Sequence, residues 1–423
     1  MKTRREFLRN SLTGVAAGWT LPAFLHHTAL GMEQKNIAAG VQAATGRDNP
    51  ITVVLQLGGG NDGLNTVVPF SQDAYYRNRP RLALQGKDIL KVNDEFGLNP
   101  NLKGVKELFD AGDAAIINGV GYPNPNRSHF RSMEIWHTAT DSDVNGHYGW
   151  LGRYFDNACA GTPDPVAGIS ISNAPPQAFL GTKQIGISMK NPQSYQFIDE
   201  HEPMLAGEDG RDMSGDSIGQ LGFSAPAEDP TTNLDFLKRT TMDAEISSDV
   251  VLDVTKRQKN AVDYPGTRLA RDLALVAQLI AGGMPTRVYY VNLGGFDTHA
   301  NQAGTHNRLM AEFSDAVSAF CKDLKALGHY DRVMVMSFSE FGRRVKENAS
   351  GGTDHGVAGP MFLFGGGVKA GTYGKYPSLL DLHKGDLKHN VDFRSVYATV
   401  LDNWMDYDSQ SVLKRKFPHL AFA

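Results

Sequence analysis

Short apolar runs alternate with helix-like segments along most of the chain, and this alternation limits the possible folds more than any other feature. The strand-like runs are predicted at 51–57, 113–119, 166–172, 286–293, 332–338 and 360–367. Between them, apolar residues recur at helical spacing, as in Leu269, Leu273, Val276 and Ile280. Strands connected through helices pair in parallel and are covered on both faces. The sequence therefore predicts an α/β fold, a three-layer αβα sandwich with a mostly parallel central sheet.

The first thirty residues have the composition of an export signal. Arg4 and Arg5 precede a modest apolar run that glycines and a proline interrupt. That run is too short to span a bilayer stably. A twin-arginine pair in this setting directs export of a folded protein by the Tat machinery, and an ordinary basic amphipathic N-terminus is the alternative. The prediction is a periplasmic or secreted protein with no stable membrane span.

The rest of the chain is organised as one large domain. Residues 31–47 read as a polar linker, and 48–423 as the α/β domain. Segment 173–247 is rich in Gly, Pro, Asp and Ser, which is typical of a lid, an insertion or a mobile loop. The formal net charge of −4 does not favour nucleic acid as a partner. Cys159 and Cys321 provide no disulfide framework, and two buried free thiols are favoured over one bridge.

Clusters of acidic residues and histidines stand at the ends of the predicted strands. In an open α/β sheet, ligands bind beyond the carboxyl ends of the strands. Carboxylates and imidazoles are suitable zinc or manganese ligands, whereas the ordinary alternatives are turn aspartates, solvated loops and surface ion pairs. We therefore expect a metal-dependent hydrolytic site, and its candidate metal ligands are Asp62, Asp297, His299, Glu340, Asp354 and His355.

Ser128 stands at the predicted start of a helix, where capping the helix is its ordinary role. A hydroxyl at a helix N-terminus near metal-binding carboxylates is also where a nucleophile would be activated. His129 is a candidate acid, base or ligand beside it, and Arg131 is a candidate clamp for anionic oxygens. The candidate catalytic residues are thus Ser128, His129 and Arg131, and the substrate-binding candidates are Arg127, Arg343 and Asn61.

Motifs that span nearly the entire chain resemble those of the exported family labelled domain of unknown function 1501. They are GGGNDGLNTVVP, SHFRSMEIWHTA, GWLGRYFD, GGFDTH, SEFGR, GTDHG and DFRSVYATVL. More broadly, the order of the acidic, serine and histidine positions resembles the alkaline-phosphatase superfamily, which includes sulfatases and cofactor-independent phosphoglycerate mutases. The resemblance implies an alkaline-phosphatase-like fold. It also implies that Asp62 is the first metal ligand, Ser128 the nucleophile, Asp297 the aspartate of the other metal and His355 the last histidine.

Two departures from the superfamily pattern concern the metal complement. Asn301 stands where the superfamily often has a histidine, and Glu340-Phe341 stands where it usually has Asp-His. These departures predict a second metal site that is weakened, absent or merged into a single-metal centre. The implied cofactor is one or two divalent ions of zinc, manganese or calcium.

The expected activity is that of a hydrolase or transferase acting on phosphate or sulfate esters. Its nucleophile is a serine or a metal-bound water, and its substrate is a small anionic ester or a sulfated or phosphorylated saccharide. The alternative is a non-catalytic cell-envelope or carbohydrate-binding protein that retains the fold.

Overall fold

A mixed, mostly parallel sheet forms the centre of the molecule. The computed structural model describes residues 49–158, 166–182, 186–192 and 250–423. In this part of the chain, nine strands form one sheet in the order β11-β5-β10-β9-β1-β8-β6-β7, with β14 beside β5. Its long strands are β1 (Ile51–Gly58), β5 (Ala114–Gly121), β8 (Val288–Gly294), β9 (Val333–Phe338) and β10 (Gly359–Gly365). β1 pairs in parallel with β8 and β9, whereas β10 is antiparallel to β9 and β5.

Shorter strands extend this sheet and form two small additional sheets. On one side of the main sheet, β6 (Gly168–Ser170) lies between β8 and the last strand, β7 (Ile187–Ser188). On the other side, β11 (Gly371–Tyr373) and β14 (Val391–Asp392) pair with β5. A separate sheet contains β2 (Val67–Val68), β3 (Leu90–Lys91) and β4 (Gly97–Leu98), and a hairpin contains β12 (Leu382–His383) and β13 (Asp386–Leu387). The hairpin carries Asp386, which bears on the candidate site below.

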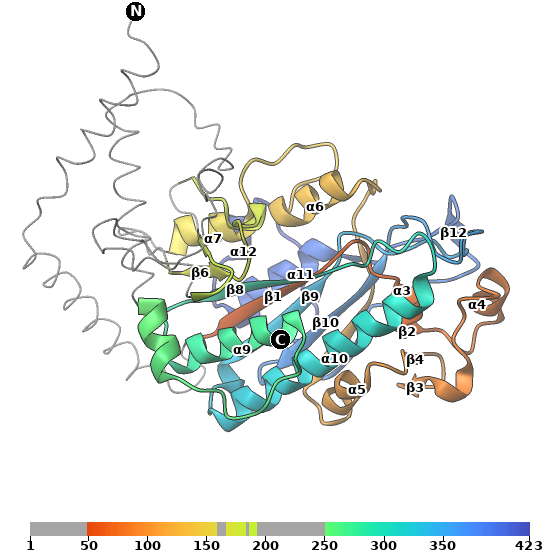
Figure 1. Ribbon diagram of the computed structural model, residues 1–423. Coiled ribbons are helices and arrows are strands. Elements are labelled where there is room, and N and C mark those ends of the chain that lie inside the picture. The colour runs from red at the N-terminus through yellow and green to blue at the C-terminus, as the bar shows by residue number, and fades with distance from the viewer. Residues whose placement is uncertain (1–48, 159–165, 183–185, 193–249) are drawn as a thin grey trace, which may run out of the picture.

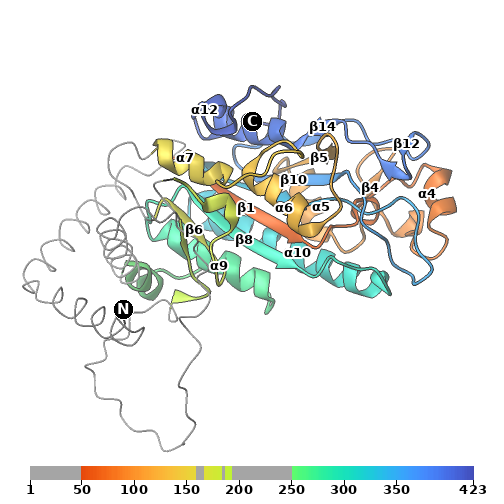
Figure 2. The ribbon, with the colours of Figure 1, turned by 90° about the horizontal axis from the view of Figure 1, so that it is seen from above.

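Helices cover both faces of the main sheet (Figures 1 and 2). One face is covered by α5 (Lys103–Asp110), α9 (Arg268–Ala281) and α10 (Gln302–Ala326). The other is covered by α6 (His129–Thr138), α7 (Trp150–Ala158), α11 (Phe393–Thr399) and α12 (Ser409–Leu413). Two short helices, α3 (Gly63–Thr66) and α4 (Asp73–Asn78), follow β1 along the chain.

The alternation of side chains along the strands produces two separate cores. Val53 and Leu55 of β1 pack with the α9 and α10 side, whereas Val54 packs with the α6 and α7 side. Successive residues of a strand point to opposite faces, so a strand covered on both faces is apolar throughout. This is the three-layer αβα sandwich predicted from the sequence.

The predicted elements agree with the observed ones apart from a few boundaries. The strand predicted at 166–172 is shorter, at Gly168–Ser170, and the C-terminal helix changes into a π-helical turn at Val400–Trp404. No helix among the described residues is long and apolar enough to cross a membrane. The predicted signal peptide, the linker, Cys159 and most of segment 173–247 lie outside the described residues, and Cys321 is buried.

The topology brings the loops of the predicted site to one edge of the sheet. β5 and β9 are both antiparallel to β10, so β5 runs in the same direction as β9, β1 and β8. The carboxyl ends of these strands therefore lie at the same end of the sheet, which is where α/β proteins bind their ligands. The antiparallel strand β10 begins at that end, so the loop before β10 lies beside the loops that follow the other strands.

Candidate metal centre

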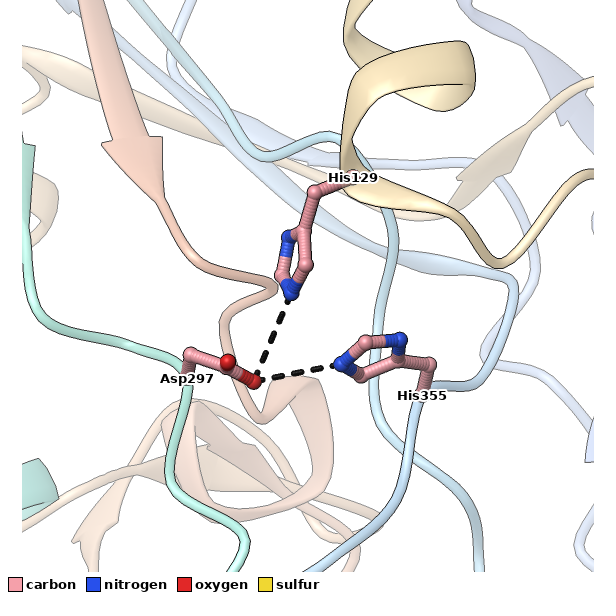
Figure 3. Close-up of side chains that lie close together, drawn as sticks. All are labelled: His129, Asp297 and His355. Carbon is pink, nitrogen blue, oxygen red and sulfur yellow. Dashed lines mark hydrogen bonds and ion pairs between the residues drawn. The ribbon is translucent and has the colours of Figure 1, made fainter.

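The side chains of His129, His299 and His355 converge on one carboxylate oxygen of Asp297. The Nε2 atoms of His299 and His355 each lie 3.1 Å from Asp297 Oδ1, and His129 Nε2 lies 3.4 Å from it. Figure 3 shows two of these rings pointing at the carboxylate. His129 begins α6, Asp297 and His299 follow β8, and His355 precedes β10. Segments far apart in the sequence thus supply one group of side chains.

The other ring nitrogen of each histidine faces an oxygen. The acceptors are Glu340 Oε1 at 2.8 Å for His129, the Arg127 carbonyl at 2.7 Å for His355, and Asp354 Oδ1 at 3.3 Å for His299. A neutral imidazole carries one N–H, and with that proton on Nδ1 each ring donates to its acceptor. Each Nε2 is then left with a lone pair directed at Asp297. This is the arrangement by which carboxylates and carbonyls orient metal-binding histidines.

The donor set fits a divalent cation. His299 Nε2 and His355 Nε2 are 2.9 Å apart, and buried His129 Nε2 has no hydrogen-bond partner among the described residues. A tetrahedral zinc ion with Zn–N bonds of about 2.0–2.1 Å would separate its ligand atoms by about 3.3 Å. The distances from Asp297 Oδ1 to the three Nε2 atoms, 3.1 to 3.4 Å, are close to that value. The ligand atoms of His129, Asp297 and His355 all lie within 4.8 Å of one another. Imidazole ligands suit zinc, copper, iron or nickel, whereas calcium takes oxygen ligands.

Asp297 is ionised over the whole neutral range. Burial alone would raise the pKa of its carboxyl, but the hydrogen bond and the positive charge of Arg343, together with the neighbouring histidines, lower that pKa to about 2. Its side chain remains 48% exposed, so the centre is open to solvent on one side. An ionised, accessible carboxylate among imidazole lone pairs is the composition of a metal site that keeps an open coordination position.

The glycine-rich turn after β1 supports the loop that carries Asp297. Gly59 has a φ of +116°, and a Cβ built there would lie 2.5 Å from the Asp297 backbone nitrogen. Only glycine allows this conformation together with this close approach. Arg343 joins the two loops, since its Nε donates to the Gly60 carbonyl at 2.7 Å and its Nη2 to Asp297 Oδ1 at 2.8 Å.

Arg343 is placed to hold the site together rather than to contact a substrate. It is buried, and besides Asp297 and Gly60 it donates to the carbonyls of Gly59, Phe296 and Thr353. A guanidinium has five N–H donors, and the protein itself occupies most of those of Arg343. Few donors of Arg343 are therefore left for the substrate-binding role expected from the sequence.

Asp62 is not one of these converging side chains and forms a buried ion pair instead. Its side chain is 1% exposed, and Arg79 Nη1 donates to its Oδ2, which also accepts from Gln302. Burial raises the pKa of Asp62, but the charge and hydrogen bond of Arg79 outweigh that effect and lower it overall. Asn61 is also buried, and its Oδ1 lies 3.1 Å from His306 Nε2. Neither Asp62 nor Asn61 is among the side chains around Asp297.

Glu340 and Asp354 stand behind two of the histidines. Glu340 is 2% exposed, and its Oε1 accepts from the Gly59 N–H at 2.9 Å as well as from His129 Nδ1. Asp354 accepts from Asn348 at 3.2 Å and contacts His299 Nδ1. Both residues, which the sequence assigned as metal ligands, contact the Nδ1 side of a histidine. In this geometry they hold the rings of two candidate ligands.

Ser128 is the N-cap of α6, but its hydroxyl makes no capping bond. The residue is exposed, and it lies between Arg127, whose carbonyl meets His355, and His129, whose ring is in the centre. Arg131 does not turn towards the centre. It pairs with Glu134 at 2.6 Å and donates to the carbonyls of Ser142 and Val144.

Several residues of this region were not predicted from the sequence, although the sequence pattern could have indicated two of them. Gln302 and His306 occupy α10 positions that share a face with buried Met310 and Phe313. Polar side chains at apolar positions of a helix need buried partners, and here those partners are Asp62 and Asn61. No sequence pattern indicates Arg79 or Asp386, because the path of the loops brings each of them to its partner.

Structures similar to this chain were found at low identity. A protein in the alkaline phosphatase superfamily from Vibrio parahaemolyticus is 8% identical, with 88% of this chain and 72% of that chain covered and a TM-score of 0.38. The PsFucS1 sulfatase from Pseudoalteromonas sp. is 10% identical, with 92% and 74% covered and a TM-score of 0.38. Ps i-CgsB, solved in complex with k-i-k-neocarrahexaose, is 11% identical, with 88% and 73% covered and a TM-score of 0.39. At TM-scores of this size, the likenesses carry no inference about activity.

Sequence comparison identifies the family directly. No curated protein matches the chain. The family model described as Protein of unknown function (DUF1501) matches residues 51–417, which include every element of the centre described above. The chain therefore belongs to the DUF1501 family.

Proposed function

We propose that this protein is a metal-dependent hydrolase that cleaves phosphate or sulfate esters at the centre formed by His129, His299, His355 and Asp297. The observation that carries the proposal is the convergence of the histidine Nε2 atoms on one ionised carboxylate oxygen. These residues would hold a divalent cation, which would supply a Lewis acid to polarise ester oxygens and to lower the pKa of a nearby hydroxyl or water.

Ser128 is the proposed nucleophile. Its hydroxyl is free of a capping bond, and it stands at the N-terminus of α6, where backbone N–H groups favour negative charge. Its Oγ loses its proton to solvent and bonds to the phosphorus or sulfur atom, while the bond to the ester oxygen breaks and that oxygen takes up a proton to leave as the alcohol. Water then hydrolyses the serine ester, which releases phosphate or sulfate and restores the serine hydroxyl. A water activated at the same centre is the alternative nucleophile.

The remaining polar residues hold this arrangement in place. Glu340, Asp354 and the Arg127 carbonyl fix the Nδ1–H tautomers of the histidines, and Arg343 fixes Asp297. Asp62 already has a cationic partner in Arg79. The proposal is therefore a centre with one metal ion, in keeping with the two departures from the superfamily pattern.

Metal analysis combined with ester hydrolysis tests the proposal. Purified protein is expected to retain about one divalent ion per chain and to hydrolyse 4-nitrophenyl phosphate, 4-nitrophenyl sulfate or both. Ser128→Ala is expected to keep the metal but to lose at least about 100-fold in kcat. His355→Ala is expected to lose both, and Ser142→Ala is the matched control.

The possible failures of this experiment separate the alternatives. Hydrolysis that survives Ser128→Ala with intact metal would assign the attack to water. Metal binding without hydrolysis of either ester would favour the alternative of a binding protein that retains the fold. A wild-type chain that binds no divalent metal would overturn the proposal.

A further inference from the structure

Two arginines share one buried carboxylate beside the candidate metal centre. Arg127 pairs with Asp386 Oδ2, and Arg344 Nε lies 3.4 Å from Asp386 Oδ1. Asp386 is 1% exposed, whereas the side chains of Arg127 and Arg344 remain 39% and 34% exposed. Two guanidinium groups thus pair with one carboxylate, and both keep a part of their surface open to solvent.

The guanidinium groups also keep unused hydrogen-bond donors. Arg127 makes its ion pair through Nη2, and Arg344 Nη2 donates to the Lys384 carbonyl at 2.8 Å. Nε and Nη1 of Arg127 and Nη1 of Arg344 donate to no acceptor among the described residues. Arginines with a purely structural role spend these donors on the protein, as Arg343 does. Planar guanidinium donors left open in this way suit the oxygens of an anion.

Both arginines are connected to His355. The Arg127 carbonyl accepts from His355 Nδ1 at 2.7 Å. The Arg344 N–H donates to the Asp354 carbonyl at 3.0 Å, next to the bridge between Arg343 and His355. Because both guanidinium groups pair with Asp386, two positive charges are held close together and repel each other. An anion bound between them would relieve this repulsion.

We propose that Arg127 and Arg344 form an anion-binding subsite that takes a second negatively charged group of the substrate. The hairpin β12–β13, which is labelled at β12 in Figure 1, supplies Asp386, and Asp386 pairs with both side chains. The inference rests on the proposed function for the identity of the reacting ester. It deepens that function, because it restricts the alcohol part of the ester to one that itself carries a sulfate, phosphate or carboxylate group.

Binding of two matched inhibitors tests the subsite without turnover. Benzene-1,3-disulfonate and benzenesulfonate differ by one anionic group, and calorimetric titration of the metal-loaded protein at low ionic strength measures both. We expect the disulfonate to bind at least about tenfold more tightly, and Arg344→Gln to reduce the ratio to about one. Lys346→Gln, which removes an exposed charge two residues away, is expected to keep the ratio. Equal affinities in the wild type, or an unchanged ratio in Arg344→Gln, would overturn the proposal.

A measurement on the unmodified protein guards against misfolding of the variant. Phenylglyoxal modifies accessible arginines, and mass spectrometry locates the modified residues. The disulfonate is expected to protect Arg127 and Arg344, whereas benzenesulfonate is expected to leave them reactive. Equal reactivity with both compounds would contradict the subsite. Selective disulfonate binding in a protein that hydrolyses no ester would support the subsite and reject the proposed hydrolase. Ester hydrolysis without selective disulfonate binding would support the hydrolase and reject the subsite.

Discussion

His299 Nε2 lies 2.9 Å from His355 Nε2, and each ring turns its other nitrogen towards an oxygen of the protein. If both rings are neutral with their protons on Nδ1, two lone pairs face each other at hydrogen-bond distance. Such a contact is repulsive unless a proton or a cation lies between the two nitrogens. Because Asp297 Oδ1 and His129 Nε2 border the same space, a shared cation satisfies more groups than a single proton does.

Removal of divalent metal is expected to destabilise the folded protein. A ligand that binds only the folded state at 100 times its Kd stabilises it by about 2.7 kcal/mol. Dialysis against a chelator should therefore lower the Tm, and zinc or manganese should restore it. His299→Ala is expected to abolish most of this metal-dependent shift. Thermal unfolding at pH 8 provides the measurement. A wild-type Tm that does not change when metal is removed or added would contradict the centre.

Glu340→Gln is expected to weaken metal binding without removing a ligand. The carboxylate of Glu340 accepts from His129 Nδ1 at 2.8 Å, so its charge increases the basicity of Nε2. The glutamine retains the shape and one acceptor but loses the charge. Substitution of such partners costs about 10- to 100-fold in metal affinity, and the smaller value is expected here.

Competition with a chromophoric chelator measures this change. Glu134→Gln is the matched control. Glu134 lies on α6, the helix that begins with His129, but it pairs with Arg131 and not with His129. A loss of metal as complete as that of Asp297→Asn would show that Glu340 itself coordinates the ion.

The fold was predictable because its information is local. The apolar runs that became β1, β8 and β9 are short, bounded by glycine or polar residues, and separated by helical stripes such as that of α9. Strand direction at β10 was not predictable, since an antiparallel strand inside a parallel sheet has the same apolar composition as its neighbours.

The sequence predicted at which end of the sheet these side chains lie, but not which of them contact each other. Asp297, His299 and His355 come together because they follow or precede strands that end at one edge. Whether a carboxylate meets a metal or a histidine depends on side-chain direction and on partners from elsewhere in the chain. Glu340 is directed to His129, and Asp62 to Arg79, a residue whose position depends on the loop after α4. Such distant pairings leave no periodic pattern in the sequence.

Asp62→Asn distinguishes a buried ion pair from a metal ligand. The substitution leaves the Arg79 guanidinium buried without its counter-charge, and breaking a buried pair in this way costs about 3–5 kcal/mol. The unfolding free energy measured in urea should fall accordingly, while the metal content of the folded protein stays unchanged. The double variant Asp62→Asn/Arg79→Gln, which removes both charges, should be less destabilised than the single variant. Loss of metal from a folded Asp62→Asn protein would restore Asp62 as a ligand.

Buried His306 is expected to make the protein less stable in mild acid. Burial lowers the pKa of its imidazole to about 4 from 6.5. The unfolded chain therefore takes up a proton first as the pH falls, so this contribution to stability is complete above pH 6.5. It is lost between pH 6.5 and about 4, by up to about 1.4 kcal/mol per pH unit.

His306→Gln tests this dependence directly. Glutamine keeps a donor for Asn61 Oδ1, which His306 Nε2 meets at 3.1 Å, but it does not titrate. Urea unfolding across this pH range should give a slope that is lower by up to one proton than in the wild type. Some slope should remain, because burial also lowers the pKa of His137 to about 4. Identical slopes in the two proteins would show that His306 is not kept neutral by the fold, and the polar network under the metal centre would then carry a positive charge at mildly acid pH.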